Sequence, residues 1–317
     1  MTDLPREFAL IARYFRPLAG PAGLALADDA AILPPIAGRE WVVSVDAMIE
    51  GVHFLPDDPP ALVARKLLRV NLSDLAAMAA RPFGYLLTLA APRATPDQWF
   101  ARFAAGLAED QAHFGLALLG GDTTATPGPI ALSLTIFGEV ATGQALRRTG
   151  AMPGDDVWVS GTIGDAALGL LARRGEQPDP DGALTARYLL PEPRLGLPLA
   201  GLARAGMDIS DGLVQDLGHL CRASGIGAEI AAPALPLSPA VRRAGAAFLP
   251  LCLTGGDDYE LLLAVPPARA SALQAAAAAA GIKITRIGQF RADPARVVVR
   301  DGDGAEIPLA QTGWSHF

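Results

Sequence analysis

The residues best suited to chemistry in this chain are aspartates set among glycines, serines and threonines. Asp122 lies in the segment GGDTT, residues 120–124, whose backbone has little side-chain cover. The apolar residues 116–119 precede it and predict a buried strand, so Asp122 is expected where a strand ends and a loop begins. Loops at strand ends commonly carry functional residues. A carboxylate in this setting is free to face a ligand.

The same construction recurs along the chain. Ser44 and Asp46 follow an apolar strand segment, and their spacing of two puts both side chains on one strand face. Asp208, Ser210 and Asp211 precede a helix, where a capping role would explain only one of them. Two carboxylates about 4 Å apart repel by roughly 4 kcal/mol at an effective dielectric constant of 20, and divalent cations remove that repulsion. These acids together predict one shared metal site.

Three further acidic segments are weaker signals by themselves. Asn71 and Asp74 are three residues apart in an otherwise apolar helix, so they share a face, and the narrow polar face favours a function. The segment GGDDYE at 255–260 repeats the pattern of glycines before acids, although a tight turn would also explain it. Asp28 and Asp29 precede an apolar run and, taken alone, fit an exposed turn.

Composition limits the class of protein. The chain has 317 residues, 51% of them hydrophobic, which is enough for two domains, and we expect these at 1–142 and 143–317. A net charge of −7 argues against a nucleic-acid surface, since phosphate contacts need a basic patch. No apolar stretch approaches the length that spans a bilayer, and residues 1–20 lack the apolar centre of a secretory signal. We therefore expect a cytoplasmic protein without a membrane partner.

The elements that must position the acids alternate between strands and helices, which predicts an α/β or α+β fold. A loop at 143–154 marks the expected domain boundary. Strands are expected at 41–47, 85–90, 116–119, 130–140, 157–160, into Asp208, 228–230, 261–265, 282–287 and 297–299. Helices are expected at 60–80, 96–114, 165–173, 184–190, 195–205, 213–223 and in the alanine run 275–280.

Common phosphate and metal machinery is absent from the sequence. Lys66 and Lys283 are the only lysines and neither follows a glycine, so a GxxxxGK phosphate loop is excluded. The glycine loop and catalytic segments of protein kinases are missing, and the four histidines form no HExxH. Cys221 and Cys252 are too few and too far apart for a zinc cage or a disulfide scaffold. Metal ions held by the aspartates would have to supply the positive charge for a phosphate ligand.

With these features the chain resembles the thiamine-monophosphate kinase family of the PurM-like superfamily, which also includes aminoimidazole ribonucleotide synthetase and selenophosphate synthetase. The resemblance runs nearly end to end in an ordered set of motifs. These are EFALIARYF at 7–15, DDAAIL at 28–33, EGVHF at 50–54, VNLSDLAAM at 70–78, GGDTT at 120–124, RRTGAMPGD at 147–155, DISDGL at 208–213, GGDDYEL at 255–261 and the terminal GWSHF at 313–317.

The resemblance implies ATP-dependent phosphorylation of thiamine monophosphate to thiamine diphosphate with several Mg²⁺ ions. It implies a PurM-like architecture with an N-terminal mixed sheet covered by helices, a C-terminal α/β domain, and a homodimer formed through the N-terminal domains. By the same carry-over, the metal ligands are Asp29, Ser44, Asp46, Asp74, Asp122, Asp208 and Asp211. The resemblance also implies that ATP is contacted by Gly121, Asp122, Arg148 and Ser210. It implies that the thiamine phosphate is contacted by His53, Asp257 and Trp314.

Three positions depart from the family pattern. Ala27 replaces a glycine before the paired acids, Val45 replaces a threonine, and Asp257 replaces a glutamate whose longer side chain reaches further. None of these changes removes a main carboxylate. Asp46, Asp74 and Asp122 are therefore the central catalytic candidates.

A related reaction stays open as an alternative. Selenophosphate synthetase needs a reactive residue near its N-terminus, whereas the first cysteine here is Cys221. An enzyme making aminoimidazole ribonucleotide is harder to exclude, although EGVHF and the GWSHF end favour the thiamine enzyme. A non-catalytic acidic protein that binds nucleotide or divalent ions would not need glycine-flanked acids in both halves of the chain.

Overall fold

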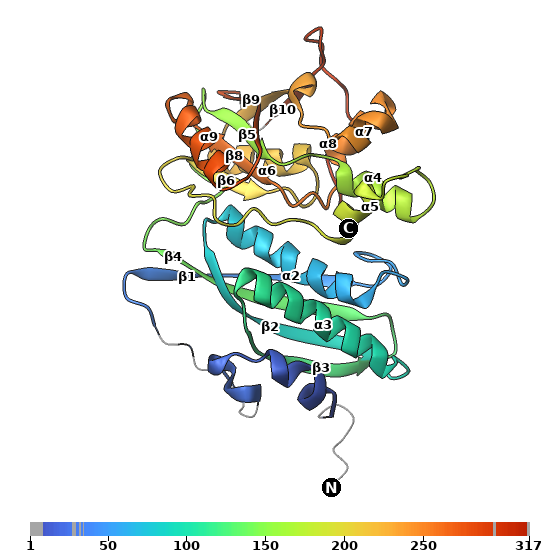
Figure 1. Ribbon diagram of the computed structural model, residues 1–317. Coiled ribbons are helices and arrows are strands. Elements are labelled where there is room, and N and C mark those ends of the chain that lie inside the picture. Colours follow the sequence, from blue (N-terminus) through green and yellow to red (C-terminus); the bar gives the residue numbers. More distant parts are fainter. Residues whose placement is uncertain (1–8, 27–29, 32, 34, 294–295, 316–317) are drawn as a thin grey trace. The chain divides into compact units, whose positions relative to one another are not determined.

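The computed structural model describes residues 9–26, 30–31, 33, 35–293 and 296–315. The chain divides into two compact units, which we call the N-terminal unit (Met1–Leu75 with Ala80–Gly143) and the C-terminal unit (Ala76–Ala79 with Gln144–Phe317). Both are drawn in Figure 1. Among the described residues, no helix is long and apolar enough to span a membrane.

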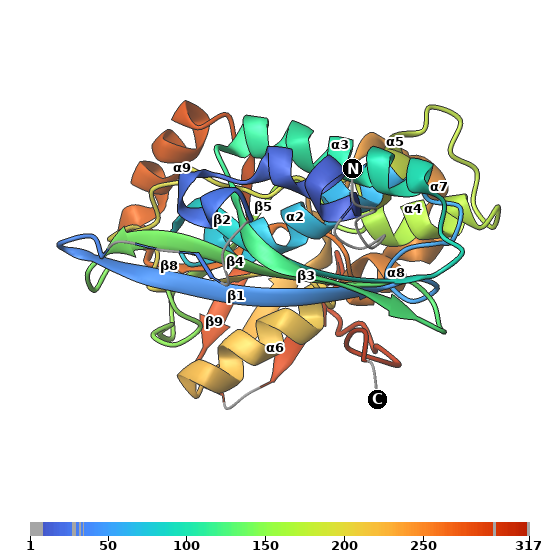
Figure 2. The same ribbon diagram turned by 90° about the horizontal axis from the view of Figure 1, so that it is seen from below.

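The N-terminal unit is built on a mixed sheet with the strand order β1-β4-β2-β3. Its strands are β1 (Arg39–Ile49), β2 (Arg81–Pro92), β3 (Leu118–Thr126) and β4 (Ala131–Ala141). Strand β4 runs antiparallel to β1 and β2, and β2 pairs parallel with β3. Helices α2 (Pro60–Ala77) and α3 (Asp97–Phe114) cover one face of this sheet, as Figures 1 and 2 show.

The two helices pack closely because a glycine lies where they meet. A Cβ at Gly106 of α3 would lie 2.1 Å from the carbonyl oxygen of Ala61 in α2, so glycine is required there. Asp110 of α3 is fully buried and accepts from Arg65 at 3.0 Å and from Arg69 at 2.7 Å, both on α2. This buried ion pair leaves the opposite side of α2 to face the sheet, where Asp74 lies.

The first residues of the described chain lie against the outer strand β3. Short helical segments η1 (Ile11–Phe15), η2 (Arg16–Leu18) and η3 (Pro21–Leu26) lead to this position. The backbone N–H of Gly20 donates to Leu118 O at 3.0 Å, and Ala19 forms a parallel bridge to the same residue. These contacts place the N-terminal segment beside the GGDTT strand.

The C-terminal unit contains a second mixed sheet, with the strand order β10-β7-β9-β5-β8-β6. Its strands are β5 (Asp156–Ser160), β6 (Ala205–Asp208), β7 (Gly227–Ala231), β8 (Leu261–Val265), β9 (Ile284–Arg291) and β10 (Val297–Arg300). Its helices are α4 (Asp165–Arg173), α5 (Ala183–Leu189), α6 (Leu213–Ser224), α7 (Pro239–Ala244), α8 (Leu249–Thr254) and α9 (Ala270–Ala279).

Both faces of this second sheet are covered. Val157 and Val159 of β5 belong to one hydrophobic cluster and Trp158, between them, belongs to another. Since side chains alternate along a strand, the two clusters lie on opposite faces. Such burial on both sides explains why β5 and β8 read as continuous apolar runs in the sequence.

Most predicted elements are confirmed, and the differences have physical reasons. The helix expected at 195–205 is wrong, because Gly196, Pro198 and Gly201 interrupt it and the segment forms turns ahead of β6. The strand expected at 116–119 instead runs over Leu118–Thr126, so Asp122 lies inside β3 and not at its end. Parallel pairing with β2 keeps this glycine-rich and threonine-rich segment extended.

Candidate active site

One group of predicted residues meets between β1 and α2 in the N-terminal unit. Ser44 Oγ donates to Asp74 Oδ2 at 2.5 Å. Alternation along β1 turns Ser44 and Asp46 to the helix-covered face, whereas Val43 and Val45 are 52% and 59% exposed on the other face. The structure therefore brings Ser44, Asp46 and Asp74 to the same side of the sheet.

Asn71 fixes the backbone at this place. It is fully buried, its Oδ1 accepts the backbone N–H of Asp46 at 3.0 Å, and its Nδ2 donates to Leu67 O at 2.9 Å. Both ends of the amide are thus satisfied, which a buried polar side chain requires. The polar face of α2 that the sequence singled out serves to attach α2 to β1 beside Asp46 and Asp74.

The donor atoms of this group suit Mg²⁺. Two carboxylates and a hydroxyl are hard oxygen ligands, and Mg²⁺ is commonly held by one or two carboxylates together with substrate phosphates. Among the described residues, no group of three or more His, Cys, Asp or Glu side chains is arranged to hold a metal ion by itself. The arrangement of Ser44, Asp46 and Asp74 fits an ion that is completed by a phosphate ligand.

Asp122 lies on the opposite face of the same sheet. It pairs with Thr88, Thr88 pairs with Ser133, and Ser133 pairs with Ala47, the neighbour of Asp46. Residues in one such row share a face, so the Asp122 and Asp46 side chains point to opposite faces. Strands β1 and β3 are also three inter-strand spacings apart, about 14 Å. The structure does not bring Asp122 together with Asp46 and Asp74, contrary to the single shared site that the sequence suggested.

A cavity of about 640 Å³ opens beside Asp122. Its lining includes residues 120–123 of β3, residues 86–88 of β2, Phe137 of β4 and Phe15 of η1. A Cβ at Gly121 would lie 1.9 Å from Leu87 O, so only glycine lets β3 approach β2 this closely. Gly121 is therefore required by strand packing, and its exposed backbone lines the cavity next to the Asp122 carboxylate.

The loop that carries Ser210 and Asp211 in the C-terminal unit is held by one buried side chain. Asp216 Oδ2 accepts the backbone N–H groups of Ser210, Asp211 and Gly212 at 3.0, 3.0 and 3.1 Å. Burial raises the pKa of Asp216 to about 7, against the lowering effect of these three bonds. Asp208 ends β6, as predicted, and is buried.

The segment GGDDYE runs beside this loop. The N–H of Asp257 donates to Ser210 O at 2.8 Å, and the N–H of Tyr259 donates to Ile209 O at 2.8 Å. Asp257 and Tyr259 have φ values of 70° and 50°, a left-handed region that such residues rarely adopt. A conformation of this kind persists only where the surroundings impose it, and it is concentrated at functional sites. The pairing sets predicted residues Ser210 and Asp257 side by side.

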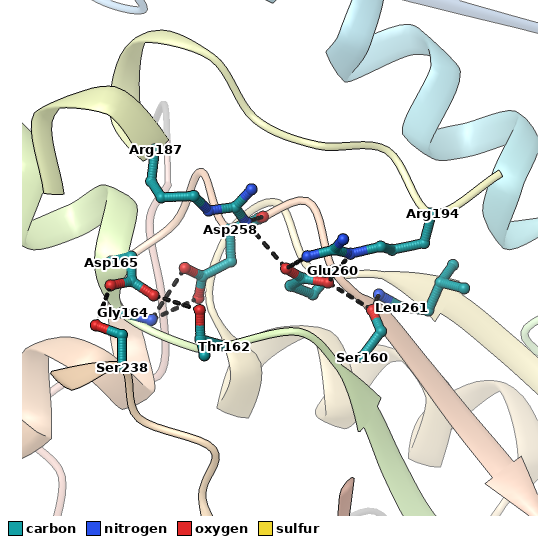
Figure 3. A network of polar contacts seen from close by, with 10 residues as sticks. All are labelled: Ser160, Thr162, Gly164, Asp165, Arg187, Arg194, Ser238, Asp258, Glu260 and Leu261. Atoms are coloured by element: carbon teal, nitrogen blue, oxygen red, sulfur yellow. Dashed lines mark hydrogen bonds and ion pairs between the residues drawn. The ribbon is translucent and has the colours of Figure 1, made fainter. Parts of the chain in front are cut away.

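A buried network imposes this backbone, and Figure 3 shows its side chains. Glu260 is fully buried and accepts from Arg194 through both oxygens at 2.6 Å, from Arg187 at 3.0 Å and from Ser160 Oγ at 2.6 Å. Ser160 Oγ in turn accepts the N–H of Leu261 at 2.7 Å. Two arginines and a hydroxyl thus compensate one buried carboxylate where β5 ends and β8 begins.

Asp258 anchors the same segment from its other side. Its two oxygens accept the N–H of Gly164 at 2.9 and 3.0 Å, and its carbonyl accepts from Arg187 at 3.1 Å. Burial raises the pKa of Asp258 well above its ordinary value. Asp258 and Glu260 are fully buried, whereas their neighbours Asp257 and Tyr259 are half-buried.

The remaining predicted residues lie in different places. Trp314 is 54% exposed, and its N–H donates to Asp211 O at 2.9 Å, so it lies beside the Asp211 loop. Arg148 is exposed, with its carbonyl near Ser224 Oγ. His53 lies in the N-terminal unit after β1, where its Nδ1 accepts the N–H of Ile49 at 3.0 Å. Asp29 lies outside the described residues.

Sequence reasoning missed the side chains that hold the candidate site in place. Asp216, Gln215, Arg187 and Arg194 carry no motif of their own and were not singled out. A spacing signal existed only for Asp216, an acid in the first helical turn after the DISDG segment, where acids are favoured. The two arginines come from a helix and a loop far along the chain from Glu260, so only folding reveals the pairing.

Comparison with known proteins identifies similar sequences along the whole chain. Family models for the AIR synthase related protein match at residues 27–140 for the N-terminal domain and 152–301 for the C-terminal domain. The chain is 45% identical to the thiamine-monophosphate kinase of Caulobacter vibrioides over 98% of this chain and 91% of that one. It is 41% identical to the thiamine-monophosphate kinase of Escherichia coli strain K12, with 98% of each chain covered.

Solved structures of similar proteins have the same two-domain fold. The thiamine-monophosphate kinase of Stenotrophomonas maltophilia K279a is 41% identical, with a TM-score of 0.81 over 89% of this chain and 91% of that one. A structure described as AaThiL complexed with AMPPCP and TMP is 32% identical, with a TM-score of 0.78 over 98% of this chain and 97% of that one.

Proposed function

Because the chain belongs to the thiamine-monophosphate kinase family of AIR synthase related proteins, we propose that it phosphorylates thiamine monophosphate to thiamine diphosphate with ATP as the donor. The observation that carries this proposal is the match to thiamine-monophosphate kinases over 98% of the chain at up to 45% identity. The relative complexed with AMPPCP and TMP supports the same two substrates.

We propose direct in-line transfer as the reaction path. A phosphate oxygen of thiamine monophosphate attacks the γ-phosphorus of ATP, the bond to the β,γ-bridging oxygen breaks, and ADP leaves. The second pKa of a phosphate monoester is about 6, so the nucleophile is already ionised near neutral pH. No catalytic base is needed, and the protein has to position two anions and offset their charge.

We propose that the acidic groups bind several Mg²⁺ ions for this purpose. Ser44, Asp46 and Asp74 would hold an ion between β1 and α2, and Asp122 would face one from the cavity beside β3. The further ligands proposed from the family motifs are Asp29, Asp208 and Asp211. Bound Mg²⁺ would supply charge neutralisation at the phosphate oxygens. Two separate acidic groups in the N-terminal unit agree with more than one ion.

ATP contacts are proposed at Gly121, Asp122, Arg148 and Ser210. The exposed glycine backbone and the carboxylate in the 640 Å³ cavity support a ligand that arrives with a cation. Arg148 is exposed, and its guanidinium would add a fixed fork to a phosphate. Ser210 is presented by a loop that Asp216 immobilises, so its position is set before a ligand binds.

The thiamine phosphate is proposed to contact His53, Asp257 and Trp314. The indole of Trp314 is 54% exposed and suits stacking on a flat heterocycle. Asp257 is shorter than the usual glutamate, and the strained backbone that the Glu260 network imposes fixes where it points. This arrangement supports a polar contact from a fixed loop and an aromatic contact from the chain end.

We further propose a cytoplasmic homodimer with an ATP-binding and metal-binding domain at 1–142 and a second PurM-like domain at 143–317. The outward face of β1 exposes Trp41, Val43 and Val45 by 42%, 52% and 59%. An apolar strip of this kind on one sheet face favours association with a second copy.

A coupled assay for ADP release tests the proposal. The purified chain is given ATP and Mg²⁺ with thiamine monophosphate, thiamine or formylglycinamidine ribonucleotide, each in a separate reaction. We expect ADP release with thiamine monophosphate alone, together with formation of thiamine diphosphate. Turnover only with formylglycinamidine ribonucleotide would assign the chain to aminoimidazole ribonucleotide synthesis instead. Nucleotide binding without ADP release in any arm would indicate a binding protein.

A further inference from the structure

A single side chain bridges two segments that carry different parts of the proposed site. Gln215 lies in the first turn of α6 and is half-buried. Its Nε2 donates to Asp211 Oδ2 at 3.2 Å and to Trp314 O at 2.7 Å. One amide group therefore joins the DISDG loop to the end of the chain.

Backbone contacts dock the same chain end independently of the amide. The N–H of Trp314 donates to Asp211 O at 2.9 Å. A Cβ placed on Gly313 would lie 2.5 Å from Gln215 Cβ and 2.8 Å from Asp211 O. The chain end thus lies so close to the first turn of α6 that residue 313 has room for glycine alone.

The docking fixes the backbone of Trp314 while its indole stays 54% exposed. The carbonyl and the N–H of residue 314 are both bound, one by Gln215 and the other by Asp211. An aromatic ring on an immobilised backbone is preorganised for a ligand, since less conformational entropy is lost on binding. Asp216 in turn holds the backbone of the Asp211 loop, so the loop to which Trp314 binds is also fixed.

We propose that Gln215 is a positioning residue that attaches the chain end bearing Trp314 to Asp211, so that the thiamine-phosphate contact and the acidic loop are organised as one unit. The role for the ligand rests on the proposed function, whereas the docking itself does not. Glutamine suits the task because its amide carries two N–H donors for two acceptors. Glutamate and methionine have nearly the same shape, but neither can donate these bonds at neutral pH.

Gln215→Met and Gln215→Glu test the proposal with two measurements. Amide hydrogen exchange reports the docking, and we expect the N–H of Trp314 to exchange about tenfold faster in Gln215→Met. Steady-state kinetics report the ligand contact, and we expect KM for thiamine monophosphate to rise about tenfold while kcat changes less. Gln215→Glu should have the larger effect, because it adds a carboxylate beside Asp211.

A matched control and a second perturbation complete the experiment. Gln289 also donates through Nε2 to a backbone carbonyl, that of Gly154 at 3.3 Å, and Gln289→Met should leave both measurements unchanged. Gly313→Ala disturbs the same contact from the chain end, because its added Cβ would meet Gln215 Cβ and Asp211 O. This variant should reproduce the effects of Gln215→Met. The double variant should add little to either single change, since both remove the same docking.

The possible outcomes separate the two proposals. Unchanged exchange at Trp314 in Gln215→Met overturns the docking role. Faster exchange with an unaltered KM for thiamine monophosphate overturns the link to the ligand. If the N–H of Trp314 exchanges faster in Gln215→Met but the wild-type chain releases no ADP with thiamine monophosphate, the proposed function is refuted and the docking role is supported.

Discussion

Ser44 Oγ lies 2.5 Å from Asp74 Oδ2, which joins β1 to α2 among the side chains that we propose to bind Mg²⁺. The hydroxyl fixes the orientation of the Asp74 carboxylate on the face where Asp46 also lies. A ligand held in this way is preorganised, because its rotamer is set by a neighbour before an ion arrives.

Asp74→Asn should abolish most of the ATP-dependent turnover without unfolding the chain. The amide keeps the shape and can still accept from Ser44, but it lacks the charge that attracts a cation. We expect kcat/KM to fall by more than about a hundredfold at saturating Mg²⁺. Thermal unfolding should stay close to wild type, and the exposed Asp181→Asn serves as the control. Near-normal ADP release would remove Asp74 from the site.

Asp122→Asn tests the cavity on the other face of the sheet. Asp122 is exposed, so the change should cost little stability. We expect turnover to fall by about a hundredfold or more, with weaker binding of a non-hydrolysable ATP analogue measured by calorimetry in the presence of Mg²⁺. Thr124→Val, at an exposed position of the same strand, should retain both activity and binding. Unaltered analogue binding by Asp122→Asn would mean that the nucleotide lies elsewhere.

Asp258→Asn should change how stability depends on pH. Burial raises the pKa of Asp258 in the folded chain. The protonated carboxyl therefore contributes fully to the free energy of unfolding below about pH 4, the ordinary carboxyl range, and this contribution is lost as pH rises through the raised pKa. The loss per pH unit is at most about 1.4 kcal/mol for one group. Asparagine does not titrate, so the free energy of unfolding of the variant should rise relative to that of wild type as pH rises.

Denaturant unfolding at pH 5, 6, 7 and 8 measures this difference. The free energy of unfolding of wild type should decline relative to that of Asp258→Asn across the series. Asp181→Asn, at an exposed position, should follow wild type at every pH. Parallel curves for wild type and Asp258→Asn would show that Asp258 keeps an ordinary pKa in the folded chain.

Val45→Glu tests the proposed dimer face. Val45 is 59% exposed on the face of β1 that points away from α2, so a charge there should not unfold a monomer. Burying the carboxylate in an interface would be costly, and we expect the association to weaken by at least about tenfold. Sedimentation velocity over a range of concentrations measures it. Met152→Glu changes an apolar residue exposed to 48% elsewhere and should leave association intact. A wild-type chain that sediments as a monomer contradicts the proposal outright.

The predicted fold followed closely from local patterns. The apolar runs of three residues in β5 and five residues in β8 predict buried strands, and the long amphipathic segments predict the helices α2 and α3, because burial sets the period of apolar residues. Prediction from local patterns was wrong where helix-breaking residues or long-range strand pairing decided the secondary structure. Gly196 and Pro198 prevented a helix, and pairing with β2 extended a strand through Asp122.

The sequence by itself determined which side chains are candidates and which chemistry they suit, since residue type and spacing depend on the covalent chain alone. It also identified the family through ordered motifs. Only the tertiary structure decided that Asp46 and Asp122 face opposite sides of one sheet, because strand order and register come from long-range hydrogen bonds. Likewise, the contacts of Gln215 with Trp314 and of Arg194 with Glu260 join segments far apart in the chain, and packing alone brings such residues together.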